Sequence, residues 1–272
     1  MSRTRSAQFK ARSPLSRSRR RDDHPSRRTS RVSSLLLATG VLIGTTGVTA
    51  AVASPAGDRA LASQINMRRT DLPAGAKWTS STTTPNTPAE NAMARKGVAC
   101  IRRVVGPALD VSPDPFGLGG GPAGDVTADV SSPTFAVAGP TQLPSASSEV
   151  AMTTTTAQAT ADLRALGTAS ALACVKTVVQ ALLTAQHLPA GTKVDIESVT
   201  PPRLADTGPG SGFRFSFSIP SFGALYDETF LYTAGRAELA LSFTSVGKPF
   251  RPDWALSISK TIVARAETLL GS

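Results

Sequence analysis

Apolar positions recur every three to four residues in three stretches of the first two thirds of the chain, a spacing typical of amphipathic helices. Thr87, Pro88 and Glu90 form a capping box that marks the start of the first helix. Two segments between the first and second helices are strand-like instead. The predicted helices are 88–105, 156–167 and 169–187, and the predicted strands are 126–138 and 147–153.

Beyond residue 190 the apolar period shortens to two, as in strands with one buried face. In the segment GFRFSFSI, for example, Phe213, Phe215 and Phe217 alternate with polar residues, which indicates a core strand. The alternating segments are 192–199, 212–219, 224–233 and 237–245, and an amphipathic helix at 252–270 follows them. Short turns join the segments, which predicts an antiparallel four-strand meander. We therefore expect a single α+β domain, an antiparallel sheet covered by helices.

An uncharged apolar run covers residues 35–53, directly after a basic tail. This order is typical of an export signal. The small residues Ala51 and Ala53 before Ser54 predict cleavage between Ala53 and Ser54. The run is also close to the roughly 20 residues that span a bilayer, so an uncleaved membrane anchor and an apolar core helix are the alternatives. Cleaved or anchored, the rest of the chain would be secreted or lie on the extracytoplasmic face of the cell envelope.

The basic charge of the chain is concentrated in that tail. The whole chain carries a net charge of +10, whereas residues 1–32 hold eleven Lys or Arg and two Asp. The rest holds 18 basic and 17 acidic side chains, too balanced for the basic surface that nucleic-acid binding needs. We expect no nucleic-acid partner. The predicted organisation is an export segment at 1–53, a linker-like segment at 54–87 and an extracytoplasmic domain at 88–272.

The chain has two cysteines, Cys100 and Cys174, each within a predicted helix. In an oxidising compartment, two cysteines of a small exported domain are expected to form a disulfide. The alternatives are a catalytic thiol, which needs a nearby histidine, and a metal site, which needs further ligands. The disulfide would join the helix at 88–105 to the helix at 169–187.

Two sequence motifs suggest chemistry that their surroundings do not support. Residues 119–124 match the dinucleotide-binding pattern G-x-G-x-x-G, but they lie in a loop and not between a strand and a helix. Ser257 and Lys260 match S-x-x-K, the nucleophile motif of penicillin-binding proteins. The other motifs of that family are absent from the sequence, and an amphipathic helix explains both residues.

The remaining candidate groups are equally isolated. Past the export segment His187 is the one histidine, which is too few for a His-based metal site or catalytic triad. Asp227 and Glu228 are adjacent in a predicted strand, so their side chains should point to opposite faces. We therefore predict no catalytic residues, no metal site and no cofactor.

The segment DLPAGAKW at 71–78, the string SSEVAM at 147–152 and the order of elements around both cysteines resemble secreted actinobacterial envelope proteins. These include the extracellular sensor domain of PknH-type serine/threonine kinases and related lipoproteins. The resemblance implies an α+β envelope domain with a ligand-sized cleft. The chain departs from the kinase sensors in having two cysteines instead of four, and no kinase domain precedes its apolar segment.

A ligand-binding or sensor-like module without catalysis is the function that these features favour. Its expected partners are a small molecule or envelope ligand and, through residues 35–53, the membrane. An apolar cleft between sheet and helices is the usual place for such a ligand, with Trp78, Arg214, Tyr226 and Tyr232 as its candidate lining. The alternative function is an envelope hydrolase that uses Ser257 and Lys260 or a carboxylate pair.

Overall fold

The structure is a computed structural model, which describes residues 54–82, 88–105, 126–185, 189–204, 210–220 and 222–271. Several features predicted from the sequence lie outside these described residues. They are the export segment with Ala51 and Ala53, the glycine motif at 119–124 and His187.

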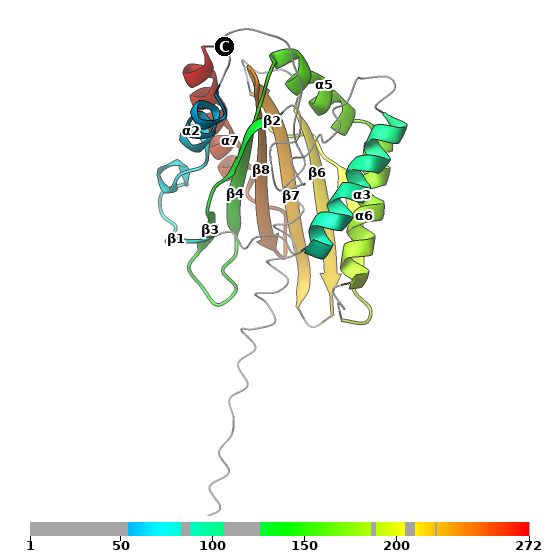
Figure 1. Ribbon diagram of the computed structural model, residues 1–272. Coiled ribbons are helices and arrows are strands. Elements are labelled where there is room, and N and C mark those ends of the chain that lie inside the picture. Colours follow the sequence, from blue (N-terminus) through cyan, green and yellow to red (C-terminus); the bar gives the residue numbers. More distant parts are fainter. Residues whose placement is uncertain are drawn as a thin grey trace, which may run out of the picture.

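An antiparallel sheet of eight strands forms the centre of the protein, in the order β1-β3-β4-β8-β7-β6-β5 (Figure 1). The eighth strand, β2, pairs with β4 on the edge that β3 also uses. The last four strands are the predicted meander, and the predicted α+β fold is confirmed. The strands are β1 (Trp78–Ser81), β2 (Val126–Ser131), β3 (Thr134–Val137), β4 (Ser145–Thr153), β5 (Lys193–Ser198), β6 (Ser211–Ile219), β7 (Gly223–Ala234) and β8 (Ala237–Val246).

Helices cover both faces of the sheet (Figure 1). On one face, α3 (Pro88–Val104), α5 (Thr156–Leu166) and α6 (Ala169–Ala185) pack over an apolar cluster that contains Phe213, Phe215 and Phe217. On the other face, α2 (Pro55–Ile65) and α7 (Pro252–Leu270) pack over a second apolar cluster. Because side chains alternate along a strand, β7 and β8 contribute to both clusters.

The predicted single strand at 126–138 is divided into β2 and β3. Pro133 lies between them and has no N–H to donate to a neighbouring strand. Ser132 maintains the connection to β4, since its N–H donates to the carbonyl oxygen of Ser148 at 2.8 Å. The two short strands therefore follow each other along one edge of β4.

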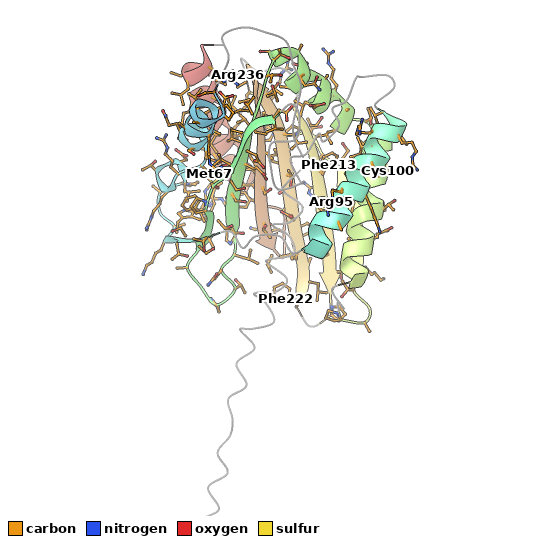
Figure 2. The ribbon with its side chains drawn as sticks, in the orientation of Figure 1. Met67, Arg95, Cys100, Phe213, Phe222 and Arg236 are labelled. Atoms are coloured by element: carbon orange, nitrogen blue, oxygen red, sulfur yellow. A yellow bond between two sulfur atoms is a disulfide. The ribbon has the colours of Figure 1, made fainter. Side chains whose placement is uncertain are left out.

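Residues 54–82, which the sequence analysis treats as linker-like, are folded onto the sheet. They form α2, a short 3₁₀ helix at Arg69–Asp71 and β1. The apolar signal was weak because α2 buries an acidic residue, Asp58, on the same side as Ala62 and Ile65. Asp58 is held by Arg236, whose Nη1 donates to Asp58 Oδ2 at 2.8 Å, and by Thr127. Figure 2 shows Arg236 at the end of the sheet beside α2.

The pKa of Asp58 reflects this pairing. Burial on its own would raise the pKa, but the hydrogen bonds from Arg236 and Thr127 and the charge of Arg236 more than offset it and lower the pKa. A carboxyl group whose pKa is lowered on folding stabilises the fold above its unfolded-state pKa, and this contribution is lost on acidification. Asp58 therefore helps to attach α2 to the sheet at neutral pH.

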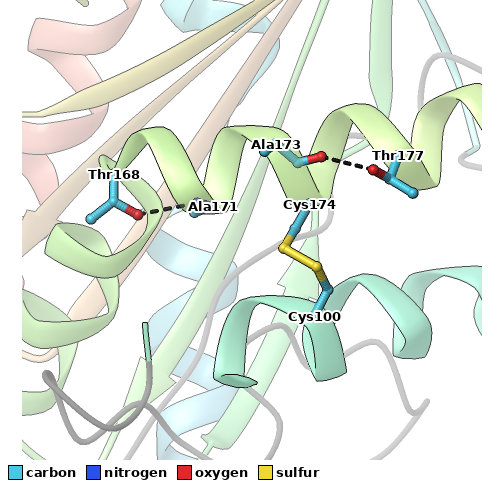
Figure 3. The surroundings of a disulfide bond; sticks show 6 residues. All are labelled: Cys100, Thr168, Ala171, Ala173, Cys174 and Thr177. Atoms are coloured by element: carbon cyan, nitrogen blue, oxygen red, sulfur yellow. Dashed lines mark hydrogen bonds between the residues drawn. A yellow bond between two sulfur atoms is a disulfide. The ribbon is translucent and has the colours of Figure 1, made fainter. Parts of the chain in front are cut away.

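Cys100 of α3 and Cys174 of α6 form a disulfide with a Cα–Cα distance of 5.7 Å (Figure 3). Cys174 is buried, and Cys100 packs at the margin of the same apolar cluster. Near the start of α6, the hydroxyl of Thr168 accepts a hydrogen bond from the N–H of Ala171 at 3.1 Å, which satisfies a free N–H of the first turn. The disulfide predicted from the sequence is confirmed.

The double substitution Cys100→Ala and Cys174→Ala should reduce the free energy of unfolding by about 3–4 kcal/mol. The sequence separation is 74 residues, and cross-linking a loop of that length restricts the unfolded chain by up to about 4.5 kcal/mol. Urea denaturation of the variant and of the oxidised wild type measures the difference. Reduced wild-type protein is the matched control. A loss below about 1 kcal/mol would contradict this role of the disulfide.

Candidate functional site

The sheet face below α3, α5 and α6 has an apolar half and a polar half. Phe213 and Phe215 on β6 lie opposite Thr229 and Asp227 on β7, and residues opposite each other in a ladder share a face. From β7 the polar positions continue across β8 to β4. The polar patch comprises six residues in two rows across these strands: Asp227, Thr244 and Ser145, and Thr229, Ser242 and Ser147.

Most of the polar patch is buried. Asp227 is 1% exposed, and Thr229 and Thr244 are 4% and 6% exposed. Members of the patch bond to one another: Thr244 Oγ1 donates to Asp227 Oδ1 at 3.3 Å, and the hydroxyls of Thr229 and Ser242 lie 3.4 Å apart. Buried polar groups need such partners to offset their lost hydration. The patch is therefore an interior polar network on a face whose other half is a hydrophobic core.

Four carboxyl side chains lie next to the polar patch, towards α5. We call them the acid cluster. Three of them surround Ala151 on β4. Asp129 on β2 and Glu238 on β8 are its direct partners on either side, and Glu149 lies two residues before it on β4. Directly opposed residues have Cβ atoms about 4.5–5.5 Å apart, so the side chains of Asp129 and Glu238 flank the methyl group of Ala151. The members of the acid cluster are Asp129, Glu149, Glu238 and Asp162.

Asp129 and Glu149 are hydrogen-bonded to each other through their carboxyl groups. Burial raises the pKa of Glu149 well above its usual value, and the negative charge of Asp129 raises it further. Burial also raises the pKa of Asp129, against the opposing effects of the Glu149 hydrogen bond and the charge of Arg59. Glu149 therefore holds its proton longer and donates it to the Asp129 carboxylate. Both side chains keep part of their surface exposed.

Glu238 is the most isolated member of the acid cluster. It is 1% exposed, and neither of its carboxyl oxygens has a hydrogen-bond partner among the described residues. Burial raises the pKa of Glu238 well above its usual value, and the charge of Asp162 on α5 raises it further. Asp162 accepts a hydrogen bond from Gln158 Nε2 at 2.9 Å. A buried acid without a donor costs stability when it ionises, which makes Glu238 a candidate functional group.

The four residues proposed from sequence as a cleft lining, Trp78, Arg214, Tyr226 and Tyr232, do not lie on this face. Trp78 is a core residue packed against Trp254, with ring centroids 5.5 Å apart. Arg214 donates to Glu228 at 2.7 Å and to Glu197 at 2.9 Å. By strand alternation, Arg214 and Tyr226 face the α7 side.

Tyr232 is 1% exposed within the apolar cluster under α7. Its hydroxyl donates to the carbonyl oxygen of Pro202 at 3.1 Å. Burial raises the pKa of Tyr232 to about 12. The hydroxyl therefore remains protonated and serves as a buried structural donor.

The candidate catalytic groups are dispersed. Ser257 and Lys260 are both exposed on α7, on the helix surface that faces away from the core. Asp227 belongs to the polar patch, whereas the adjacent Glu228 binds Arg214 and the N–H of Phe250 on the other face. The adjacent carboxylates thus point apart, as their positions in a strand predict.

The described residues offer no metal site and one shallow hollow outside the acid cluster. No three His, Cys, Asp or Glu side chains within the described ranges are arranged to hold a metal ion. A shallow hollow of about 400 Å³ lies between α2 and α7 and includes Arg68 and Arg265 in its lining. Arg265 already donates to Asp71 and to the carbonyl oxygens of Ile65 and Asn66. The acid cluster therefore remains the stronger candidate.

The acid cluster is not apparent from the sequence, because Asp129, Glu149 and Glu238 occupy the polar positions of alternating strands. Such positions normally face water. A strand that lies in the middle of a sheet and is covered on both faces breaks that expectation. The order of the strands, which places β8 between β4 and β7, is the information that the sequence pattern lacked.

The substitution Glu238→Gln should stabilise the protein at pH 7.5, by at least about 1 kcal/mol, the free energy of one pKa unit. A carboxyl group with a raised folded-state pKa is protonated in both states at low pH. As the pH rises, the unfolded chain ionises first, so stability falls until the folded-state pKa is passed. The amide keeps the shape of the side chain and cannot ionise, so the variant does not lose stability in this way. The stability difference between the variant and the wild type should therefore disappear near pH 4, where Glu238 is protonated in both states.

Thermal unfolding of both proteins across this pH range measures the effect. The matched control is Glu267→Gln on α7, which makes the same substitution away from the acid cluster. Equal pH dependence in wild type and Glu238→Gln would show that Glu238 ionises freely and would contradict the assignment.

No protein family model matches this chain, and no curated protein matches it either.

Proposed function

We propose that the chain is an exported ligand-binding module of the cell envelope, of sensor-like type and without catalysis, which binds a small polar ligand at the acid cluster and polar patch. The single observation behind this proposal is Glu238, a carboxyl group 1% exposed with no partner for either oxygen in the described part of the chain. Groups that cost stability in this way concentrate at functional sites.

The disulfide supports the assignment to an extracytoplasmic location. Disulfides persist in oxidising compartments and are rare in the cytosol, and Cys100 and Cys174 are bonded. None of the helices among the described residues is long and apolar enough to cross a membrane. Residues 35–53 lie outside that range, and we propose that they act as the export signal, or as an anchor where they are not cleaved.

The resemblance to the extracellular sensor domain of PknH-type kinases and related lipoproteins is part of this proposal. It is supported by the α+β fold and by the disulfide between two helices on one face of the sheet. A sensor-like domain needs a ligand site but no catalytic centre, which is consistent with a buried polar patch beside an acid cluster.

A carboxylate-based envelope hydrolase is the second candidate, because Asp129 and Glu149 share a hydrogen bond between carboxyl groups. Two carboxyl groups that share one proton can activate water in hydrolases. The pairing is too close for the roughly 5 Å separation of retaining glycosidases. The exposed positions of Ser257 and Lys260 on α7 give the serine-based version no support.

Thermal unfolding with a panel of sugars, amino sugars, amino acids, polyamines and cell-wall peptides tests the ligand-binding proposal. A ligand at about 100 times its Kd adds about 2.7 kcal/mol of stability, which raises the Tm by about 5–10 °C for a domain of this size. Glu238→Gln, which keeps the side-chain shape and removes the ionisable carboxyl group, should abolish most of that increase.

Glu267→Gln on α7 is the matched control and should retain the full increase. A compound that stabilises wild type and Glu238→Gln equally would bind elsewhere and would contradict the assigned site. If no compound of any class stabilises the wild type, the ligand-binding proposal fails. Release of new products from these compounds by wild type, and not by Asp129→Asn, would favour the hydrolase instead.

A further inference from the structure

Three buried acceptor atoms around Ala151 have no hydrogen-bond donor among the described residues. They are both carboxyl oxygens of Glu238 and Oδ1 of Asp129. The two residues are the direct ladder partners of Ala151 on its two sides, so their side chains extend over the same methyl group. Glu149, two residues along β4, lies on the same face and binds Asp129.

The acid cluster is open on one side and closed on the other. Asp129 and Glu149 keep part of their surface exposed, whereas Glu238 lies behind them and is buried against α5, close to Asp162. A ligand would therefore enter past Asp129 and Glu149 from the β2 edge. Its leading group would meet the free oxygens of Glu238.

The ionisable groups around Glu238 are almost all acidic. Asp162 acts on it from α5, and Asp129 and Glu149 lie beyond Ala151 on β2 and β4. Arg59 is the cation that acts on Asp129. Arg236, two residues from Glu238, is engaged with Asp58 and the carbonyl oxygen of Thr153. The described residues thus provide acceptors but leave Glu238 without a cation.

The chemistry of these atoms restricts the ligand. A primary ammonium group has three N–H donors and no acceptor, which matches three acceptor oxygens. A hydroxyl group is a poorer match, because it has one donor and its lone pairs would face the carboxylate oxygens. A metal ion lacks its set of ligands, since the described residues form no group of three suitable side chains.

We propose that the acid cluster is an amine-binding site, in which the primary ammonium group of a small ligand donates to Glu238 and Asp129. This inference rests on the proposed ligand-binding function and specifies its ligand class. The ammonium group would supply the hydrogen-bond donors that the buried oxygens of Glu238 and Asp129 lack.

Binding is coupled to proton release. Glu149 and Glu238 hold their protons well above the usual pH range of a glutamate. When R–NH₃⁺ binds, a carboxyl group at the contact loses its proton to the solvent and becomes the carboxylate that accepts the N–H. The ammonium group keeps its protons, and no covalent bond forms. Affinity should therefore rise with pH, by up to about tenfold per pH unit for each proton released.

Isothermal titration calorimetry with 1,4-diaminobutane tests this inference, with 1,4-butanediol as the uncharged analogue of the same length. At pH 7.5 and constant ionic strength, we expect saturable binding of the diamine and none of the diol. Titrations in phosphate and in Tris, whose ionisation enthalpies differ, should report the release of about one proton. The affinity should fall between pH 7.5 and pH 6.5, by up to about tenfold.

Glu238→Gln and Asp129→Asn should each weaken diamine binding at least tenfold, and circular dichroism should show that both are folded. Glu267→Gln is the matched control and should bind as the wild type does. Undiminished binding in both cluster variants, or equal binding of the diol, would overturn the inference. If the diamine does not bind while another compound gives a Glu238-dependent increase in Tm, the amine assignment fails and the ligand-binding function stands. If no compound binds, both the amine assignment and the ligand-binding function fail.

Discussion

The burial of β8 on both faces is the constraint on which the rest of the structure depends. Every residue from Ala237 to Ser245 is buried, because β4 and β7 flank the strand and the residues above and below it are covered. The sequence of β8 nevertheless alternates between apolar and polar side chains. Its odd positions, such as Leu239 and Phe243, fill the apolar cluster below α7, which forces the even positions into the interior on the opposite face.

That opposite face can be polar because stability is supplied elsewhere. Burying a polar group without a partner costs about 1–3 kcal/mol on mutational scales. Fully burying one large apolar side chain contributes a similar amount in the opposite direction. The apolar clusters on the two sides of the sheet contain many such side chains. The fold also provides partners for other buried acids: Arg236 binds Asp58 and Arg265 binds Asp71. Glu238 differs from these acids because no basic side chain in the described residues reaches it.

Much of the fold could be predicted because its signals are local. The alternation in GFRFSFSI indicated β6, the capping box at Thr87 indicated α3, and the two cysteines after a predicted export signal indicated the Cys100–Cys174 bond. The pairing of β4 with β8 could not be predicted, because it joins Val150 to Leu239 across 89 positions of the sequence. Without that pairing, Asp129, Glu149 and Glu238 remain separate polar residues in amphipathic strands. Their proximity exists only in the assembled sheet.

The position of α2 has a mechanical consequence for how the domain is held. Ser54 caps this helix by accepting a hydrogen bond from the N–H of Gly57 at 3.1 Å, and one turn later Asp58 is fixed to Arg236. The described fold therefore begins at Ser54, the residue that follows the apolar segment 35–53 in the sequence. If residues 35–53 remain in a membrane, a pull or a rotation of that segment would act on α2 without being absorbed by a tether. The distance and the orientation of the sheet relative to the bilayer would then be set by a single helix.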